Sequence, residues 1–342
     1  MRKILIHAPS FSGGRLFDPG ARDSCLEPFV HLRHRLLALG YQLETSDDRS
    51  VEECAWVWFW DVPDTVTSGV NSSFWGRIGE WRKSRGTRER DVYRECIRAG
   101  LRHKLALFLA EPPVVLPQNW DPAMHELFPV IFTWRDDYVD GRKFLKFREA
   151  VPSQFPEVPR VPFGARKLLV NISGNKCSVH PNELYSARRE TIRHFERSRL
   201  YDFDLYGVGW DDPSKIDAVY PSYRGTVKHK WEVYPYYRFG LCYENMRDVP
   251  GLVSEKIFDC MRAGCVPIFW GASNITDHVD AEAFVDRKAF KSDSELERFL
   301  EGVSEREYGR YHEAMRDYLA SDRFAAFLSP AFANTIIRGL RL

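Results

Sequence analysis

The chain has 342 residues, of which 44% are hydrophobic and 28% charged, a composition that excludes collagen-like, coiled-coil and intrinsically disordered chains. Forty-nine Lys and Arg against 48 Asp and Glu leave a net charge of +1, so the charge of the whole chain does not favour nucleic acid as a partner. Aromatic residues reach 14%, and such rings either fill a core or form platforms that stack on sugars and bases.

Short apolar runs alternate with segments of helical periodicity in the first half of the chain. Strands are predicted at Ile4–His7, Tyr41–Thr45, Ala55–Trp60, Leu105–Ala110 and Val130–Thr133. Helices are predicted over Leu26–Leu39 and Val92–Leu101, where the apolar residues recur with helical spacing. Strands separated by helices favour an α/β class with a doubly wound parallel sheet.

A proline-rich stretch between Val151 and Pro162 predicts a linker. We therefore expect an N-terminal Rossmann-like domain over 1–160 and a C-terminal domain over 161–342, with a ligand cleft between them and the last helix packing back on the first domain. The second half repeats the alternation. Strands are predicted at Lys167–Ile172, Asp204–Tyr206, Phe239–Tyr243 and Val266–Trp270. Helices are predicted at Leu184–Arg197, Ser254–Ala263, Asp293–Glu301, Glu305–Ala320 and Pro330–Leu340.

The seven cysteines are scattered, odd in number and contain no Cys-x-x-Cys pair, which argues against a zinc site or a disulfide framework. We expect them to act as small hydrophobic residues in a reducing cytosol. The apolar run that starts at Ile4 stops at His7, too soon for a signal peptide. No stretch approaches the roughly 20 apolar residues that span a bilayer. The sequence thus predicts a cytoplasmic protein.

Polar residues follow the predicted strand Phe239–Tyr243. Glu244 and Asn245 come directly after it, at the edge of an open α/β sheet where ligands bind. Ser254 is predicted to cap the next helix, which places Glu255 and Lys256 in its first turn. The helix dipole disfavours a lysine there, unless an anion such as a diphosphate docks at the helix start. A lysine that extends outward into solvent is the alternative interpretation.

The same region reads Tyr237-Arg238-Phe239-Gly240-Leu241-Cys242-Tyr243-Glu244-Asn245, then Leu252-Val253-Ser254-Glu255-Lys256, then Ala263-Gly264-Cys265-Val266-Pro267. It resembles the signature of the family 10 glycosyltransferases, the α-1,3/1,4-fucosyltransferases. That signature has a Tyr-Lys-Phe-x-Leu-x-Phe-Glu-Asn strand, a Tyr-[Val/Ile]-Thr-Glu-Lys helix start and an Ala-Gly-x-Val-Pro turn. The likeness continues to Phe290, and such a set of spacings is far more specific than a lone glycine-rich loop.

Weaker likeness lies upstream. Glu111-Pro112-Pro113 resembles the family's Glu-Ser-Pro, and Asn175 with Arg189 resembles the Ser-Asn…Arg pattern of its donor domain. Lys228 and Lys230 both fit the lysine that precedes the signature strand.

The resemblance implies a GT-B fold and inverting transfer of L-fucose from GDP-β-L-fucose to a glycan hydroxyl, in an α-1,3 linkage. Glu111 is then the candidate base that takes the acceptor proton. Arg189 and Lys256 are the candidate cations for the diphosphate, and Glu255 is expected to bind ribose or fucose hydroxyls. The remaining candidate donor-binding residues are Asn175, Lys228, Glu244 and Asn245. Each has a structural alternative: Glu111 as a loop residue before a Pro-Pro turn, Glu244 and Asn245 as partners of backbone groups.

No obligatory cofactor and no divalent metal are expected, because GT-B enzymes of this kind stabilise the leaving group with fixed positive charge. Leu252 stands where the family has a tyrosine, which leaves open another GDP-6-deoxyhexose as donor. A non-catalytic glycan-binding relative is a further alternative. The acceptor is expected to be a glycan, lipid-linked in one version, in surface-polysaccharide or lipopolysaccharide synthesis; no nucleic acid is expected and no oligomeric state is predicted.

One basic segment stands out against the neutral whole. Residues 75–104 hold ten Lys and Arg against four acidic residues, with Trp75 and Trp81 among them. The segment is interpreted either as a solvated helix face or as a patch for an anionic acceptor or the cytoplasmic side of a membrane. The second interpretation predicts peripheral contact with the inner face of the plasma membrane.

Overall fold

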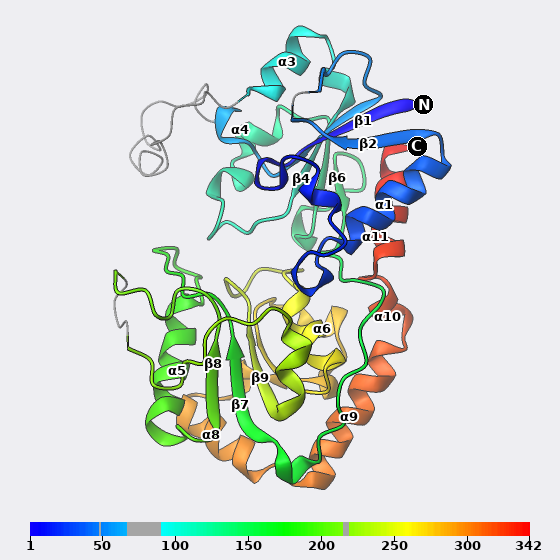
Figure 1. Ribbon diagram of the computed structural model, residues 1–342. Coiled ribbons are helices and arrows are strands. Elements are labelled where there is room, and N and C mark those ends of the chain that lie inside the picture. Colours follow the sequence, from blue (N-terminus) through cyan, green and yellow to red (C-terminus); the bar gives the residue numbers. More distant parts are fainter. Residues whose placement is uncertain (48, 67–89, 215–218) are drawn as a thin grey trace. The chain divides into compact units, whose positions relative to one another are not determined.

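The computed structural model describes residues 1–342 except 48, 67–89 and 215–218. The chain folds into two compact units (Figure 1). The first consists of Met1–Pro19, Leu26–Phe147 and Ala333–Leu342, and the second of Gly20–Cys25 and Arg148–Phe332. The change of unit at Phe147 thus comes before the expected boundary at 160, and a short N-terminal segment belongs to the second unit.

The first unit is built on a six-stranded parallel sheet with the order β2-β1-β3-β4-β5-β6. Its strands are β1 Arg2–His7, β2 Tyr41–Thr45, β3 Trp56–Trp60, β4 Leu105–Leu109, β5 Val130–Thr133 and β6 Phe144–Lys146. The five residues of β4 are all buried, as expected for a central parallel strand that helices cover on both faces. The strand order reverses between β1 and β3, and ligands of such sheets bind where it reverses.

Helices α1 Glu27–Ala38, α3 Val92–Arg98 and α4 Pro122–His125 belong to this unit, together with most of α11 Ser329–Leu340. Gly339 of α11 lies against the Phe132 ring of β5, because a Cβ atom at this glycine would come within 2.8 Å of it.

Aromatic rings form much of the first unit's core. Trp58 is fully buried, and Phe108 stacks on Trp60 and Phe132 with ring centroids 5.5 and 4.6 Å apart. Trp58 and Trp60 therefore take part in the packing of this core, and the fully buried Trp58 is not open for stacking on a sugar.

The second unit contains a five-stranded parallel sheet with the order β11-β10-β9-β7-β8. Its strands are β7 Lys167–Ile172, β8 Phe203–Tyr206, β9 Tyr237–Tyr243, β10 Val266–Trp270 and β11 Val285–Asp286. The helices are α5 Tyr185–Ser198, α6 Glu255–Arg262, α7 Ile275–His278, α8 Asp293–Gly302, α9 Glu305–Leu319 and α10 Asp322–Ala325 (Figure 1). Gly240 of β9 lets α6 pack closely, since a Cβ atom there would lie 2.7 Å from the Cys260 sulfur.

Two parallel sheets with their helices confirm the predicted α/β class with two Rossmann-like parts. The predicted strands and helices are present within one or two residues of their expected ends, except that the helix predicted over Val92–Leu101 already ends at Arg98. The short strands β6 and β11 were not predicted. All seven cysteines are free, and five of them are buried.

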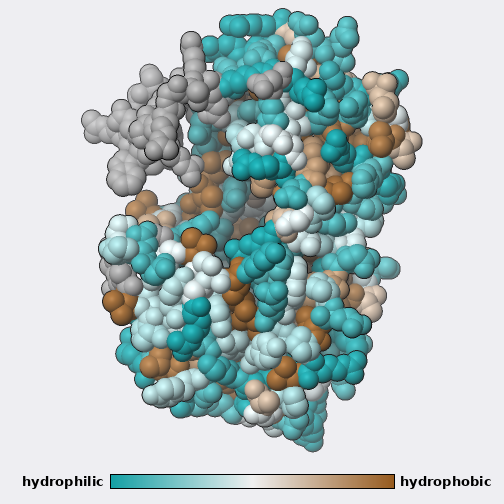
Figure 2. Space-filling view, viewed as in Figure 1, coloured by the Kyte–Doolittle hydropathy of each residue, from teal (hydrophilic) through white to brown (hydrophobic). Residues whose placement is uncertain are grey.

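The face drawn in Figure 2 is largely hydrophilic, with hydrophobic residues scattered over it. Leu37 and Leu39, at the end of α1, are examples of apolar side chains that are about half exposed; small exposures of this kind are ordinary on a protein surface. In the described part of the chain, no helix has both the length and the apolar character needed to cross a bilayer.

Candidate functional site

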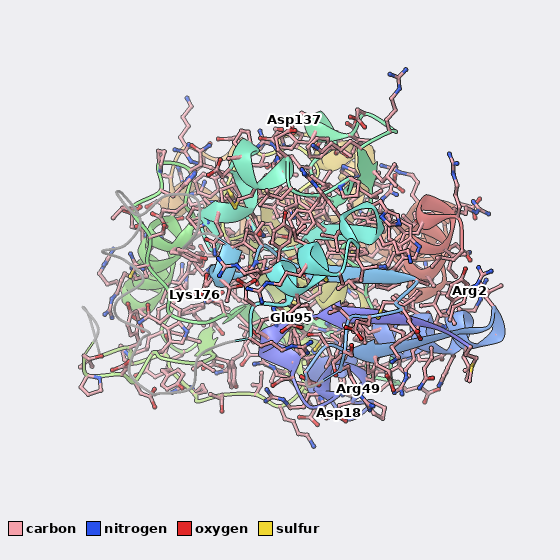
Figure 3. All side chains as sticks on the ribbon, turned by 90° about the horizontal axis from the view of Figure 1, so that it is seen from above. Arg2, Asp18, Arg49, Glu95, Asp137 and Lys176 are labelled. Carbon is pink, nitrogen blue, oxygen red and sulfur yellow. The ribbon has the colours of Figure 1, made fainter. Side chains whose placement is uncertain are left out.

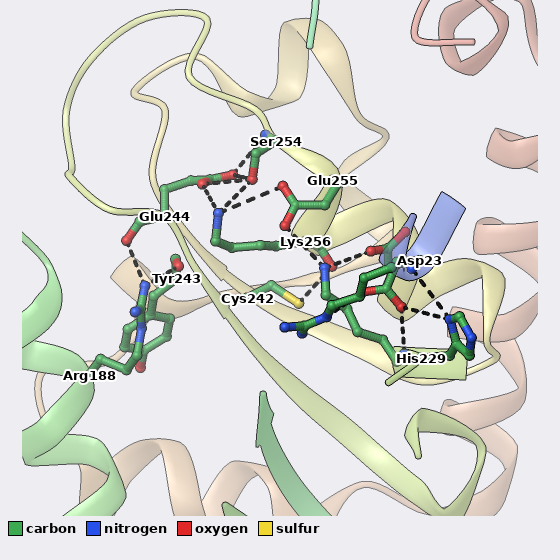
Figure 4. A network of polar contacts seen from close by, with 12 residues as sticks. Asp23, Arg188, His229, Cys242, Tyr243, Glu244, Ser254, Glu255 and Lys256 are labelled. Carbon is green, nitrogen blue, oxygen red and sulfur yellow. Dashed lines mark hydrogen bonds and ion pairs between the residues drawn. The ribbon is translucent and has the colours of Figure 1, made fainter. Parts of the chain in front are cut away.

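The carboxyl end of β9 carries a buried acidic residue that organises the start of α6. Glu244 is only 1% exposed. The backbone N–H and the hydroxyl of Ser254 both donate to its Oε1, at 2.8 and 2.7 Å, and Lys256 Nζ lies 3.0 Å from its Oε2 (Figure 4). The predicted cap is therefore wrong in one respect: Ser254 occupies the N-cap position, but its hydroxyl makes no capping bond and donates to Glu244 instead.

Lys256 is half-buried and paired with a carboxylate, and does not extend freely into solvent. Burial by itself lowers the pKa of this lysine, but Glu244 and then Glu255 raise it, and the net shift is upward. Its ammonium group also lies 2.9 Å from Ser254 Oγ. The lysine that the helix dipole disfavours is thus balanced by a buried carboxylate, which holds a fixed positive charge at the sheet edge.

A second ion cluster adjoins the first. Lys230, only 8% exposed, lies in the 3₁₀ turn Lys230–Glu232, and its Nζ is 2.8 Å from Asp259 Oδ2 and 3.1 Å from Glu255 Oε1. Burial opposes the charge of Lys230, yet Glu255 and Asp259 raise its pKa overall. Burial also raises the pKa of Glu255, but the two lysines lower it more strongly. Glu255 is therefore an ionised group shared between Lys230 and Lys256.

Asp23 joins this cluster from the N-terminal segment of the second unit. Its carboxylate accepts a hydrogen bond of 2.8 Å from the Lys230 backbone N–H and lies 3.9 Å from His229 Nδ1 (Figure 4). The 3₁₀ turn Arg22–Ser24 that carries it has a left-handed φ of 53° at Asp23, a conformation that costs energy in a residue other than glycine. Sequence reasoning missed Asp23, His229 and Asp259.

Two neighbouring arginines of α5 have different surroundings. Arg188 is 3% exposed and donates to the carbonyl oxygens of Tyr243 and Glu244 at 2.6 and 3.0 Å. Burial lowers its pKa. Arg189 is half-buried and donates to the carbonyl of Lys176, a residue labelled in Figure 3, at 2.6 Å. The structure therefore brings Arg188 to the Glu244 cluster, whereas the predicted Arg189 points to the loop after β7.

The other predicted donor-binding residues lie at different places in the second unit. Asn245 follows Glu244, and its carbonyl accepts a bond of 3.0 Å from Leu184. Asn175 is buried in the loop after β7, where its N–H donates to the Val208 carbonyl at 2.9 Å. Lys228 is exposed. Of the two lysines that fit the family pattern, Lys230 is the one in the ion cluster.

The candidate base lies at the corresponding edge of the first unit. Glu111 follows β4 and its side chain is exposed. Its backbone is held on both sides, because its N–H donates to Asp61 Oδ1 at 3.0 Å while its carbonyl accepts from Trp120 Nε1 at 3.0 Å and from Asn119 Nδ2 at 3.2 Å. Burial raises the pKa of Asp61 to about 6. None of these three partners was predicted.

A cavity of about 240 Å³ opens at the carboxyl ends of β1 and β2 in the first unit. His7 lines it and lies with Nδ1 2.9 Å from Ser46 Oγ, and burial lowers the pKa of this histidine to about 4. Arg90, also on the wall, donates to the carboxylate of Glu95 and to the carbonyl of Arg49, both labelled in Figure 3.

Two further expectations concern the basic segment 75–104 and a bound metal ion. Residues 75–89 of the basic segment lie outside the described residues; in the remainder, Arg90 pairs with Glu95 and Arg94 with Asp91. Within the described ranges, no group of three or more His, Cys, Asp or Glu is arranged to hold a metal ion.

Two units, each built on a parallel sheet with polar residues at its carboxyl edge, have the architecture of the GT-B fold. A solved α1,3-fucosyltransferase with GDP-fucose aligns over 100% of this chain and 90% of its own, with a TM-score of 0.52 and 13% identity. At that identity the likeness concerns the fold.

Sequence comparisons point to one family over part of the chain. Residues 176–329 match the model of the glycosyltransferase family 10 (fucosyltransferase) C-terminal domain. An alpha-(1,4)-fucosyltransferase of Arabidopsis thaliana is 28% identical over 160 residues, which are 44% of this chain and 38% of that protein. An alpha-(1,3)-fucosyltransferase of Helicobacter pylori is 36% identical over 67 residues, 20% of this chain and 14% of that protein. The matched stretches thus span well under half of either relative.

Proposed function

We propose that this protein transfers L-fucose from GDP-β-L-fucose to a hydroxyl of a glycan acceptor, with inversion at C1 to give an α linkage. The observation that carries the proposal is the ion cluster of Glu244, Lys256, Glu255 and Lys230 at the carboxyl edge of β9. It lies inside the segment that matches the fucosyltransferase family, and the curated relatives are named as fucosyltransferases.

In the second unit, two lysines paired with carboxylates would meet the negative charge that grows on the diphosphate as the sugar leaves. Lys256 and Lys230 are held in place by carboxylates before any ligand arrives, so little reorganisation is needed when charge develops. Arg189, a half-buried residue of α5 that donates to the Lys176 carbonyl in the loop after β7, would supply a forked donor to phosphate oxygens. Glu255 is ionised and would accept hydrogen bonds from ribose or fucose hydroxyls, with Asn245, Asn175 and Lys228 as further contacts.

In the first unit, Glu111 would act as the general base toward the acceptor hydroxyl. The acceptor oxygen forms its bond to C1 of fucose as the bond from C1 to the diphosphate oxygen breaks. The bonding electron pair leaves with GDP, and the acceptor proton moves to the Glu111 carboxylate. The exposed carboxyl group on a tightly held backbone suits this role.

The donor has one specific alternative. Leu252 is 5% exposed and stands where the family has a tyrosine. The tyrosine hydroxyl near the nucleotide is therefore missing, and another GDP-6-deoxyhexose is the alternative donor. The proposed linkage is α-1,3, and the proposed process is surface-polysaccharide or lipopolysaccharide synthesis. The acceptor is a glycan, which is lipid-linked in one version of the proposal. The cytoplasmic location and the peripheral membrane contact through residues 75–104 belong to it as well.

The test measures GDP release from GDP-fucose across an array of glycan acceptors. Glu111→Gln should abolish transfer while GDP still raises the melting temperature, because a ligand that binds only the folded state stabilises it. Glu52→Gln changes another exposed glutamate of the first unit and should leave transfer unchanged. Full activity in Glu111→Gln would refute the base assignment, and a larger thermal shift with another GDP-sugar would refute fucose as donor.

A further inference from the structure

Asp61 ties the ends of two neighbouring strands together in the first unit. It follows β3, has a left-handed φ of 69°, and its backbone N–H donates to the Phe108 carbonyl of β4 at 2.9 Å. A non-glycine residue in this conformation stores strain. The surrounding structure must therefore hold Asp61 in place.

The side chain of Asp61 gathers the loop that carries the candidate base. A single oxygen, Oδ1, accepts hydrogen bonds from the N–H groups of Ala110 and Glu111, at 2.8 and 3.0 Å, and from Asn119 Nδ2, at 2.5 Å. Because strands β3 and β4 are adjacent and parallel, this oxygen lies at their common carboxyl edge. It thus fixes the first two residues after β4.

Asn119 and Trp120 complete the hold from the other side. Asn119 is fully buried, and its Oδ1 accepts from the Val62 N–H at 2.8 Å, which anchors it to the same turn as Asp61. The Glu111 carbonyl accepts from both Asn119 and Trp120. Both polar groups of the Glu111 backbone are therefore bound, whereas its carboxylate has no hydrogen-bond partner within the described ranges.

The left-handed backbone and the buried carboxylate of Asp61 both cost free energy, which a residue that only closes a turn would not need to spend. Burial raises the pKa of Asp61 to about 6 even though three N–H donors favour its charged form, and the nearby Glu111 carboxylate adds to the shift. Strain and an unfavourably placed charge at one residue are typical of functional sites. They indicate that the turn at Asp61 serves to position the loop that carries Glu111.

We propose that Asp61 is a positioning residue for the catalytic base: it holds the Glu111 backbone so that the carboxylate stands at a fixed place beyond β4. This inference rests on the proposed role of Glu111. A shift of about 1 Å in a reacting group can cost about 100-fold in rate. The effect of Asp61 is thus expected in kcat.

The experiment compares two variants of Asp61 with a neighbouring control. Asp61→Asn keeps an oxygen that can accept the same three N–H bonds and should retain most of kcat. Asp61→Ala releases the loop, and its kcat should fall about 100-fold with the KM for GDP-fucose and the affinity for GDP unchanged, since the donor residues lie in the other unit. Asp64→Asn alters the carboxylate that pairs with Gln118 and should behave as the wild type.

A milder variant covers the case in which Asp61→Ala does not fold. Trp120→Phe keeps a ring against Trp134, whose centroid lies 5.1 Å away, and removes only the bond to the Glu111 carbonyl. Its kcat should fall while its KM stays constant. A wild-type kcat in Asp61→Ala, or in Trp120→Phe when Asp61→Ala does not fold, would overturn the inference. So would an Asp61→Asn variant as inactive as Asp61→Ala.

The base assignment is tested separately by Glu111→Gln. If Glu111→Gln is inactive but Asp61→Ala keeps its full kcat, the positioning role fails and the proposed function stands. If Glu111→Gln is fully active, Glu111 is not the base, and a loss in Asp61→Ala would then need another cause.

Discussion

Lys256 Nζ and Glu244 Oε2 lie 3.0 Å apart, and the carboxylate of this pair is almost completely buried beneath the start of α6. The pair joins the residue that directly follows β9 to the first turn of α6. Removal of one partner from such a pair costs far more than the pair contributes, because the other charge stays buried without compensation.

Glu244→Gln tests this pair. The amide oxygen can still accept from Ser254, but the charge opposite Lys256 is lost. We expect the free energy of unfolding to fall by about 3 kcal/mol, measured by urea denaturation at equilibrium. Glu282→Gln changes an exposed glutamate of the same unit and should cost less than about 0.5 kcal/mol. Equal stability of the two variants would show that Lys256 does not depend on Glu244.

Much of the fold could be predicted because buried parallel strands read as continuous apolar runs. The strands Val130–Thr133, Lys167–Ile172 and Val266–Trp270 have the expected bounds. So has Tyr41–Thr45, in which the more buried and the more exposed residues alternate. Strand β6 was missed because it has three half-buried residues, and β11 because it has two. Segments of that length carry no periodicity.

The sequence predicted the part of the candidate site that lies on one strand end and the helix after it. Glu244, Glu255 and Lys256 are brought together by one strand and the helix that follows it. Asp23 could not be found in this way, since 207 residues separate it from Lys230. Arg188 did have a signal: it precedes the buried Ile192 and Phe195 by four and seven residues, the spacing of one helix face.

The two lysines that fit the family pattern make opposite predictions. Lys230→Met leaves Asp259 and Glu255 without their shared cation, so we expect a loss of about 3 kcal/mol in unfolding free energy and a weaker affinity for GDP. Lys228→Met should leave stability unchanged, because the side chain is exposed. Calorimetric titration with GDP on both variants decides the assignment. A larger loss of GDP affinity in Lys228→Met would assign the donor contact to Lys228.

Gly271 limits the space around Glu244. A Cβ atom at this position would lie 2.6 Å from Glu244 Cγ, which is closer than real Cβ contacts allow. Gly271→Ala should therefore displace the carboxylate, cost about 1–3 kcal/mol and weaken GDP binding. Gly302→Ala is the matched control, because nothing lies within 4 Å of a Cβ there. Wild-type GDP affinity in Gly271→Ala would show that Glu244 can move without affecting the donor site.

His312 of α9 makes the second unit sensitive to acid. Its Nε2 is buried and has no hydrogen-bond partner in the described part of the chain. Burial, and then the charges of Arg166 and Arg316, lower the pKa of this histidine to about 4, compared with roughly 6.5 in an unfolded chain. The unfolded chain therefore takes up a proton at a pH where the folded protein does not. The contribution of His312 to the free energy of unfolding is therefore complete above pH 6.5 and is lost as the pH falls toward 4.

His312→Phe should remove this acid sensitivity. The phenyl ring can keep the contact with Tyr308, whose ring centroid lies 4.6 Å from that of His312. Between pH 7.5 and pH 5, the stability of the variant relative to the wild type should rise by about 2 kcal/mol, at 1.36 kcal/mol for each pH unit below 6.5. Urea denaturation at the two pH values measures the difference. His103→Phe, which changes an exposed histidine, should show no such rise, and a rise of equal size in both variants would mean that His312 is not the group responsible.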